Sequence, residues 1–147
     1  MDWRDLYRQD RHEVGYLFYN ETVMDHFKNP RNVGEIPDAD GVALVGDPTC
    51  GDHIRVYIKV EDERIVDFRY KVFGCAAAIA TTSILSELVK GKPLDDALMI
   101  TDDDVIKAAG GIPSRKAHCS LLGVVGLHKA IDDYLRRRYE ATGGDKR

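Results

Sequence analysis

The chain has 147 residues, is 44% hydrophobic and carries a formal net charge of −4. This length supports one hydrophobic core and is too short for two domains of ordinary size. The acidic balance argues against a nucleic-acid-binding surface, and no apolar run approaches the roughly 20 residues that span a bilayer. The amino terminus also lacks the apolar segment of a signal peptide. We therefore expect a cytoplasmic protein whose partners are neither nucleic acid nor membrane.

The first quarter of the chain is predicted to be helical and then irregular. Apolar residues have helical spacing from about residue 3 to residue 28, with a break near Gly15. The second helix is predicted to end at Asn29-Pro30, because the residue before a proline disfavours helical backbone. Residues 31–47 are rich in Gly, Pro, Asn and Asp, which predicts a loop with one short strand at Val42–Val45.

An antiparallel hairpin with one buried face is predicted next. Residues 54–60 and 66–72 alternate apolar and polar side chains with period two. The intervening residues, Glu61–Arg64, are charged and suit a turn.

Three helices are predicted after the hairpin, at residues 76–90, 101–110 and 117–139. Cys75 thus lies where a strand passes into a helix. Thr101 and Asp104 have the spacing of a capping box, with an aspartate in place of the usual glutamate. The helix at 76–90 has an apolar stripe at Ala77, Ala80, Ile84 and Leu88. The last helix has one at Leu121, Val124, His128, Ile131 and Leu135.

The three cysteines, Cys50, Cys75 and Cys119, are far apart in sequence, and each on its own could be a core residue. Two of them have another potential metal ligand within two positions, Asp52 near Cys50 and His118 beside Cys119. Thiolates with an imidazole and a carboxylate suit zinc or iron-sulfur iron. A helix amino terminus stabilises the thiolates of Cys75 and Cys119. The residues alone leave open a shared metal site or three separate core cysteines.

Two histidines on predicted helices are more simply explained by packing than by metal binding. His26 lies on an amphipathic helix, and His128 lies on the apolar stripe of the last helix. We expect His26 to pack or form an ordinary hydrogen bond, and His128 to be half-buried with its hydrogen bonds satisfied. We assign no role to His53, although it follows Asp52 directly.

Four separated motifs resemble those of the IscU/NifU-type iron-sulfur cluster scaffold family in order and in spacing. They are Met24-Asp25-His26-Phe27-Lys28-Asn29-Pro30-Arg31-Asn32-Val33-Gly34, Cys50-Gly51-Asp52, Gly74-Cys75 followed by Ala78-Ile79-Ala80, and His118-Cys119-Ser120. The resemblance covers residues 16–139, and it leaves residues 1–15 as a helical extension and 140–147 as a flexible tail. It implies an α+β fold with a small antiparallel sheet of about three strands, packed on one face by several helices.

The resemblance implies a scaffold and not an enzyme. Such a protein accepts persulfide sulfur from a cysteine desulfurase, binds iron, builds a transient 2Fe-2S cluster and passes it to apo iron-sulfur proteins. The ligands would be Cys50, Cys75 and Cys119, with Asp52 or His118 completing the coordination. A ferredoxin-type electron donor is the further expected partner, a homodimer is possible, and isolated protein could contain zinc.

Two residues are expected to have special roles in this scheme. Asp52 is expected to keep the cluster exchangeable, because a cluster with four thiolate ligands is held more tightly than one with a carboxylate. Cys119 is expected to accept the persulfide first, because a thiolate at a helix start beside His118 and Lys116 is well activated. Cys50, on a loop, is the competing acceptor.

The segment before His118 departs from the family pattern. Many members have Leu-Pro-Pro-Val-Lys there, a sequence bound by a dedicated Hsp70-type chaperone, whereas this chain has Ile112-Pro113-Ser114-Arg115-Lys116. Recognition by that chaperone is therefore doubtful.

Two functions of other classes are alternatives. One is a zinc-dependent sulfurtransferase that carries persulfide, and the other is a zinc-bound regulatory partner of the desulfurase. The sulfurtransferase branch of the family has an insertion between its second and third cysteines. Cys119 follows Cys75 by 44 positions with no extra loop, which favours the scaffold.

Overall fold

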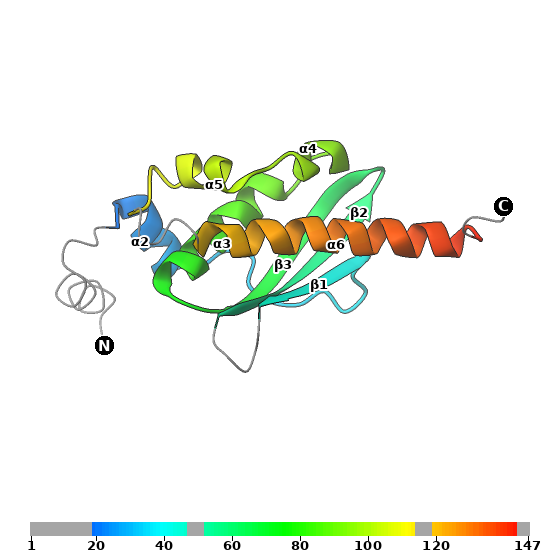
Figure 1. Ribbon diagram of the computed structural model, residues 1–147, viewed down its shortest axis with the longest axis horizontal. Helices are drawn as coiled ribbons and strands as arrows, with labels where there is room; N and C mark the ends of the chain where they lie inside the picture. The colour runs from blue at the N-terminus through cyan, green and yellow to red at the C-terminus, as the bar shows by residue number, and fades with distance from the viewer. Residues whose placement is uncertain (1–18, 47–51, 114–118, 144–147) are drawn as a thin grey trace.

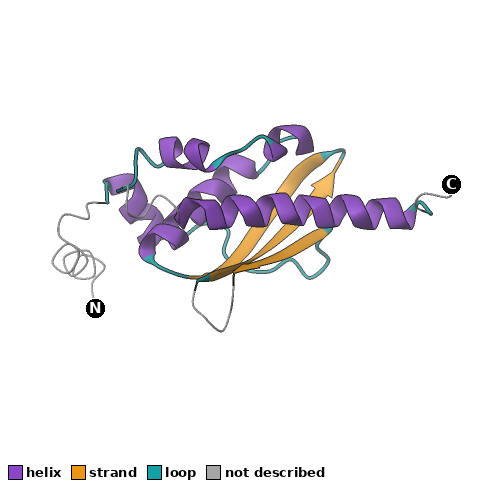
Figure 2. Cartoon of the chain, viewed as in Figure 1, coloured by secondary structure: helices purple, strands orange, loops and turns teal. Residues whose placement is uncertain are grey.

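The computed structural model describes residues 19–46, 52–113 and 119–143 of the chain. Three antiparallel strands form one sheet in the order β1-β2-β3, with helices packed on one of its faces (Figures 1 and 2). The strands are β1 (Gly41–Gly46), β2 (His53–Glu61) and β3 (Arg64–Phe73). The helices are α2 (Glu21–Lys28), α3 (Ala76–Val89), α4 (Leu94–Leu98), α5 (Asp102–Ala108) and α6 (Cys119–Ala141). The predicted α+β fold with a three-stranded sheet is confirmed.

Several predictions lie outside the described residues and have no structural counterpart here. These are the helical extension at residues 1–15, Cys50, the segment from Ser114 to His118, and residues 144–147. The helix predicted after the break at Gly15 begins only at Glu21, with Asn20 as its N-cap. Helix α6 continues to Ala141, two residues beyond its predicted end. None of the helices within the described ranges has the length and apolar character needed to cross a membrane.

The sheet presents its apolar face to the helices because its side chains alternate between two faces. Ile54, Val56 and Ile58 of β2 are fully buried, whereas Arg55 between them is exposed. The predicted turn connects the paired residues Glu61 and Arg64. Its two central residues, Asp62 and Glu63, both have positive φ (51° and 62°), as a two-residue turn requires to match the twist of the strands.

Helix α6 lies across the sheet and against α3, as Figure 1 shows. Its buried face differs in part from the predicted one, since Leu121 is 47% exposed and the buried residues include Gly123, Val124, Gly126, Leu127, Ala130 and Ile131. The hydrophobic pattern missed this face because small residues, which allow close packing, occupy its contact points. A Cβ at Gly41 of β1 would collide with the backbone carbonyl oxygen of Ala130.

Helix α3 is the central helix, and side chains are buried nearly all round it. The predicted stripe is correct for Ala77, Ala80 and Ile84, but Thr82, Ser83 and Ser86 are buried as well, along with other residues of the helix. This helix packs between α2, α6 and β3. Several faces of α3 are therefore buried, and not only the face that packs on the sheet.

Two histidines illustrate different outcomes of the packing prediction. His26 is buried between α2 and α3, with Nδ1 2.7 Å from Ser83 Oγ and Nε2 3.3 Å from Glu87 Oε1. Burial lowers the pKa of His26 below its ordinary value, so the neutral ring persists at pH 7. His128 is half-buried as expected, but its Nε2 has no hydrogen-bond partner among the described residues.

The segment between α3 and α6 contains one predicted helix and one that was not predicted. Asp104 N–H donates to Thr101 Oγ1 and Thr101 N–H donates to Asp104 Oδ2 (3.3 and 2.9 Å), so the capping box of α5 is confirmed. Helix α4 was not predicted, because Lys92-Pro93 directly after the helix predicted at residues 76–90 is typical of a helix end. Pro93 is in fact its N-cap, a place near a helix start where a missing N–H is tolerated.

Replacement of Gly41 by alanine tests the close contact between β1 and α6. The added Cβ forces the strand and the helix apart, so Gly41→Ala should lower the free energy of unfolding by about 1–3 kcal/mol. Urea unfolding measures the change. The control is Leu44→Ala on the same strand, where a half-exposed side chain is removed and a change within about 0.5 kcal/mol is expected. Equal midpoints for Gly41→Ala and the unmodified chain would refute the packing constraint.

Candidate functional site

Cys75 lies at the junction between the sheet and the central helix. It is the N-cap of α3, with extended backbone (φ −72°, ψ 171°), and follows the end of β3 by two positions. Its side chain forms no capping hydrogen bond and is half-buried. The predicted location of Cys75 at a strand-to-helix junction is therefore confirmed.

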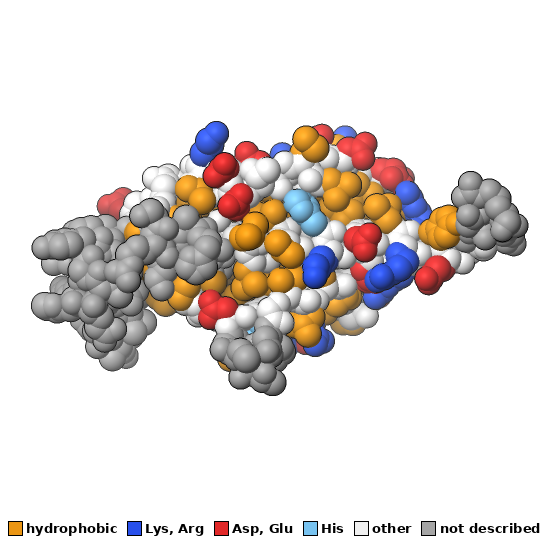
Figure 3. Space-filling view, in the orientation of Figure 1, with side chains coloured by type: hydrophobic (Ala, Val, Ile, Leu, Met, Phe, Trp, Pro, Cys, Tyr) orange, Lys and Arg blue, Asp and Glu red, His pale blue; other side chains and the backbone are white. Residues whose placement is uncertain are grey.

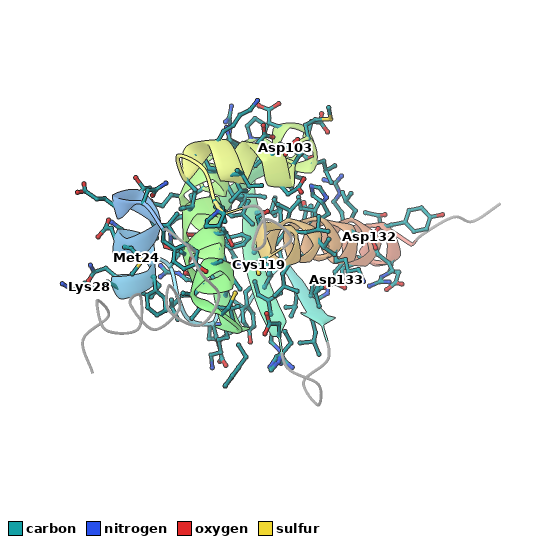
Figure 4. The ribbon with its side chains drawn as sticks, turned by 60° about the vertical axis from the view of Figure 1, so that its left-hand side comes forward. Met24, Lys28, Asp103, Cys119, Asp132 and Asp133 are labelled. Atoms are coloured by element: carbon teal, nitrogen blue, oxygen red, sulfur yellow. The ribbon has the colours of Figure 1, made fainter. Side chains whose placement is uncertain are left out.

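Cys119 is brought to Cys75 by the packing of α6 on α3. It is the first described residue of α6 (Figure 4). Its exposed fraction is only 5%. Its Sγ lies 3.3 Å from Cys75 Sγ, within hydrogen-bonding distance for a thiol pair and longer than the roughly 2.05 Å of a disulfide bond. Gly123 lies one turn further along α6, where a Cβ would come within 3.1 Å of Leu85 and 3.2 Å of Thr82 on α3.

Asp52 directly precedes β2 and lies close to Gly74, the residue before Cys75. A Cβ at Gly74 would stand 3.3 Å from Asp52 Oδ2 and 3.0 Å from the Cβ of Ala78. Because Gly74 has no side chain, the carboxylate of Asp52 fits directly beside it. The glycine beside Cys75 indicates from sequence alone that backbone can approach a bound group closely there, but the carboxylate of Asp52 as its neighbour was not predicted.

A pocket of about 250 Å³ opens beside Cys119. Asp52 provides a charged group in its wall, and the other described residues that line it are Val45, Ala78, Cys119, Leu121, Leu122 and Val125. Figure 3 shows apolar side chains gathered on the face of the molecule along α6. Leu121, which was assigned to the core, belongs instead to this pocket, and the apolar wall was not predicted.

Of the five predicted ligands, the structure places three at the same end of the sheet. Asp52 and Cys119 line one pocket, and Cys75 contacts Cys119. Cys50 and His118 lie outside the described residues, although Cys50 is two positions from Asp52 and His118 precedes Cys119. Within the described ranges, no three His, Cys, Asp or Glu side chains form a group that could hold a metal ion. Two thiols with a nearby carboxylate nevertheless have the donor chemistry of zinc and iron-sulfur sites.

His53 occupies a position close to the site without facing the thiols. It is paired with Phe73 across β2 and β3, and the two rings stack with centroids 5.0 Å apart and planes 15° apart. Phe73 is 70% exposed. This aromatic pair lies at the end of the sheet from which Gly74 and Cys75 continue, so the strands keep His53 at the outer surface.

Comparison with known proteins gives consistent results for sequence and fold. The sequence model of the NifU-like N-terminal domain matches residues 18–141. The iron-sulfur cluster assembly scaffold protein IscU 1 of Archaeoglobus fulgidus is 56% identical over 119 residues, which cover 81% of this chain and 78% of that protein. The IscU scaffold protein of Escherichia coli is 44% identical, over 83% of this chain and 98% of its own length.

A solved structure supports the fold independently. The N-terminal NifU-like protein of Brucella abortus matches with a TM-score of 0.68 at 23% identity, over 80% of this chain and 94% of that one. At this identity the likeness concerns the fold alone. The sequence match over most of the chain shows that it belongs to the family of NifU-like N-terminal domains.

Proposed function

We propose that this protein is a scaffold on which iron-sulfur clusters are assembled. The observation that carries the proposal is the Cys75–Cys119 thiol pair, 3.3 Å apart beside a pocket that Asp52 also lines. It occurs in a chain 56% identical to a protein named as an iron-sulfur cluster assembly scaffold. The cluster is then cargo that is built and handed on, so the protein acts as a carrier and not as an enzyme.

The proposed ligands are Cys50, Cys75 and Cys119, with Asp52 or His118 as the fourth. Thiolates bind iron strongly, and the amino terminus of α3 stabilises negative charge at Cys75. Sulfur would arrive as persulfide from a cysteine desulfurase, and electrons from a ferredoxin-type donor. The product would be a 2Fe-2S cluster destined for apo iron-sulfur proteins, assembled in the cytoplasm by a monomer or a homodimer.

Anaerobic reconstitution tests the proposal. Incubation with ferrous iron, cysteine and a cysteine desulfurase should give a visible chromophore that moves to an apo-ferredoxin. Cys75→Ser and Cys119→Ser should each abolish stable loading, because a serine hydroxyl does not replace a thiolate ligand. Met99→Ala, at an exposed position on the C-cap of α4, is the matched control and should load normally.

The alternative functions give different results in the same experiment. A zinc-dependent sulfurtransferase would take up zinc, remain colourless and carry labelled sulfur without iron. A zinc-bound regulatory partner would carry neither sulfur nor iron, and would unfold when a chelator removes its zinc. Either result would contradict the scaffold proposal.

Asp52 is proposed to keep the cluster transferable. An oxygen ligand binds iron less tightly than a thiolate, and Asp52 lies in the pocket through which a recipient would approach. Asp52→Ala should therefore slow transfer to apo-ferredoxin by about tenfold. The rate is followed by the absorbance change on transfer, with Asp95→Ala, an exposed carboxylate on α4, as the control. An unchanged rate for Asp52→Ala would exclude this role.

Cys119 is proposed as the first acceptor of persulfide, in competition with Cys50. Cys75→Ser protein retains only these two thiols, so it allows a direct comparison. After one turnover with the desulfurase in the absence of iron, peptide mass spectrometry should find the added sulfur on the Cys119 peptide. Removal of Cys50 as well should leave that signal unchanged. Sulfur found mainly on Cys50 would reverse the assignment.

A further inference from the structure

We propose that Cys75 reduces the persulfide formed on Cys119 and thereby releases sulfide for cluster assembly. This inference rests on the proposed function, and it adds a reacting role for Cys75 beyond that of a ligand. A persulfide carries sulfur at the oxidation state of zero, whereas a cluster contains sulfide. Two electrons are therefore required between arrival of the sulfur and its incorporation.

The distance between the two sulfurs suits an intramolecular attack. Reacting atoms in near-attack geometry are about 3–3.5 Å apart, and the Sγ atoms of Cys75 and Cys119 are 3.3 Å apart. Closing this gap to a disulfide bond requires a movement of only about 1.2 Å. Both cysteines belong to well-packed helices, Cys75 as the N-cap of α3 and Cys119 on α6, so the pair is held in place before reaction.

The position of Cys119 determines which sulfur of the persulfide each reactant can reach. Cys119 is 5% exposed, and its Sγ is reached from outside through the adjoining pocket, which it lines. The outer sulfur of a persulfide has space in the adjoining pocket of about 250 Å³, which Cys119 lines. Cys75, which the structure describes, does not line this pocket. Its Sγ, 3.3 Å from Cys119 Sγ, is placed to reach this inner sulfur.

The proposed step is a thiol-disulfide exchange in which the outer sulfur is the leaving group. The Cys75 thiolate attacks Cys119 Sγ, the Cys75–Cys119 sulfur-sulfur bond forms, and the bond from Cys119 Sγ to the outer sulfur breaks. The outer sulfur leaves as hydrosulfide with the electron pair of that bond. Sulfane sulfur is reduced to sulfide, and the two cysteines are oxidised to a disulfide, so charge and atoms balance.

The disulfide must be reduced before both cysteines can act as cluster ligands again. This takes two electrons and two protons and restores two thiols. The ferredoxin-type donor of the proposed function is the source of these electrons, supplied one at a time. The electron donor would then act on the Cys75–Cys119 disulfide and not on the persulfide itself.

Sulfide release without iron tests the inference. The full-length protein is loaded anaerobically with a small-molecule persulfide such as glutathione persulfide, then desalted in the absence of iron, desulfurase and electron donor. We expect one sulfide per loaded persulfide, and a protein lighter by two hydrogens in which the Cys75 and Cys119 peptides are linked. Cys75→Ser should retain the extra sulfur on Cys119 and release sulfide more slowly by about a hundredfold.

The variants are chosen so that folding does not confuse the result. Serine is a favoured N-cap residue, so Cys75→Ser preserves the start of α3. Met99→Ala, at the exposed C-cap of α4 and outside the site, is the control and should release sulfide at the unmodified rate. Circular dichroism of each variant checks that the helices persist.

Three outcomes would overturn the inference. They are a persulfide that remains on Cys119 of the unmodified protein as long as on Cys75→Ser, extra sulfur that moves intact to Cys75, and failure of Cys119 to accept sulfur at all. None of them would exclude the scaffold itself, because cluster loading from ferrous iron and inorganic sulfide does not involve a persulfide. Failure of that separate loading would count against the proposed function instead.

Discussion

The close approach of α6 to the sheet and to α3 is the constraint on which the site depends. Gly41 and Gly126 lie where α6 meets the sheet, and Gly123 lies where it meets α3. Side chains there would move α6 outward, and Cys119 is carried on this helix. A displacement of about 1 Å would remove its Sγ from near-attack distance to Cys75. Backbone packing thus sets the geometry of the thiol pair.

The side of α3 that faces α2 and the following loop is held by hydrogen bonds, whereas its contact with α6 depends on small residues. Ser83 Oγ accepts the backbone N–H of Arg31 at 2.9 Å, and Asn32 Nδ2 donates to Ser86 Oγ at 2.9 Å. His26 adds its contact with Ser83 from α2. Buried polar bonds of this kind specify one register between packed elements. The loop after α2 therefore contributes to the position of Cys75, although it lies far from the thiols in sequence.

The sequence allowed prediction of the features that depend on local physics. The hairpin, the Thr101 capping box and the position of Cys75 follow from period-two alternation, side-chain caps and a strand-to-helix transition, which neighbouring residues determine. The buried face of α6 depends on which elements pack against it. Its glycines permit this packing, but they do not count as apolar residues in a search for a hydrophobic stripe. For that reason Leu121 was misassigned and the pocket wall was missed. The resemblance to a family predicted that Cys75 and Cys119 lie close together, which their separation in the sequence alone did not indicate.

The structure separates two tasks that a scaffold must combine. The thiols of Cys75 and Cys119 are carried by packed helices, which hold their Sγ atoms 3.3 Å apart. The apolar pocket walls formed by Leu122 and Val125 reduce the local dielectric, which strengthens interactions between thiolates and a cation. Asp52, which we propose as a weaker, oxygen-based ligand, lines the same pocket next to a glycine that leaves it space. In the proposed scaffold, the thiolates on the two helices therefore retain the cluster. The carboxylate of Asp52 allows its release, because the bond from iron to the weaker ligand is the first to exchange.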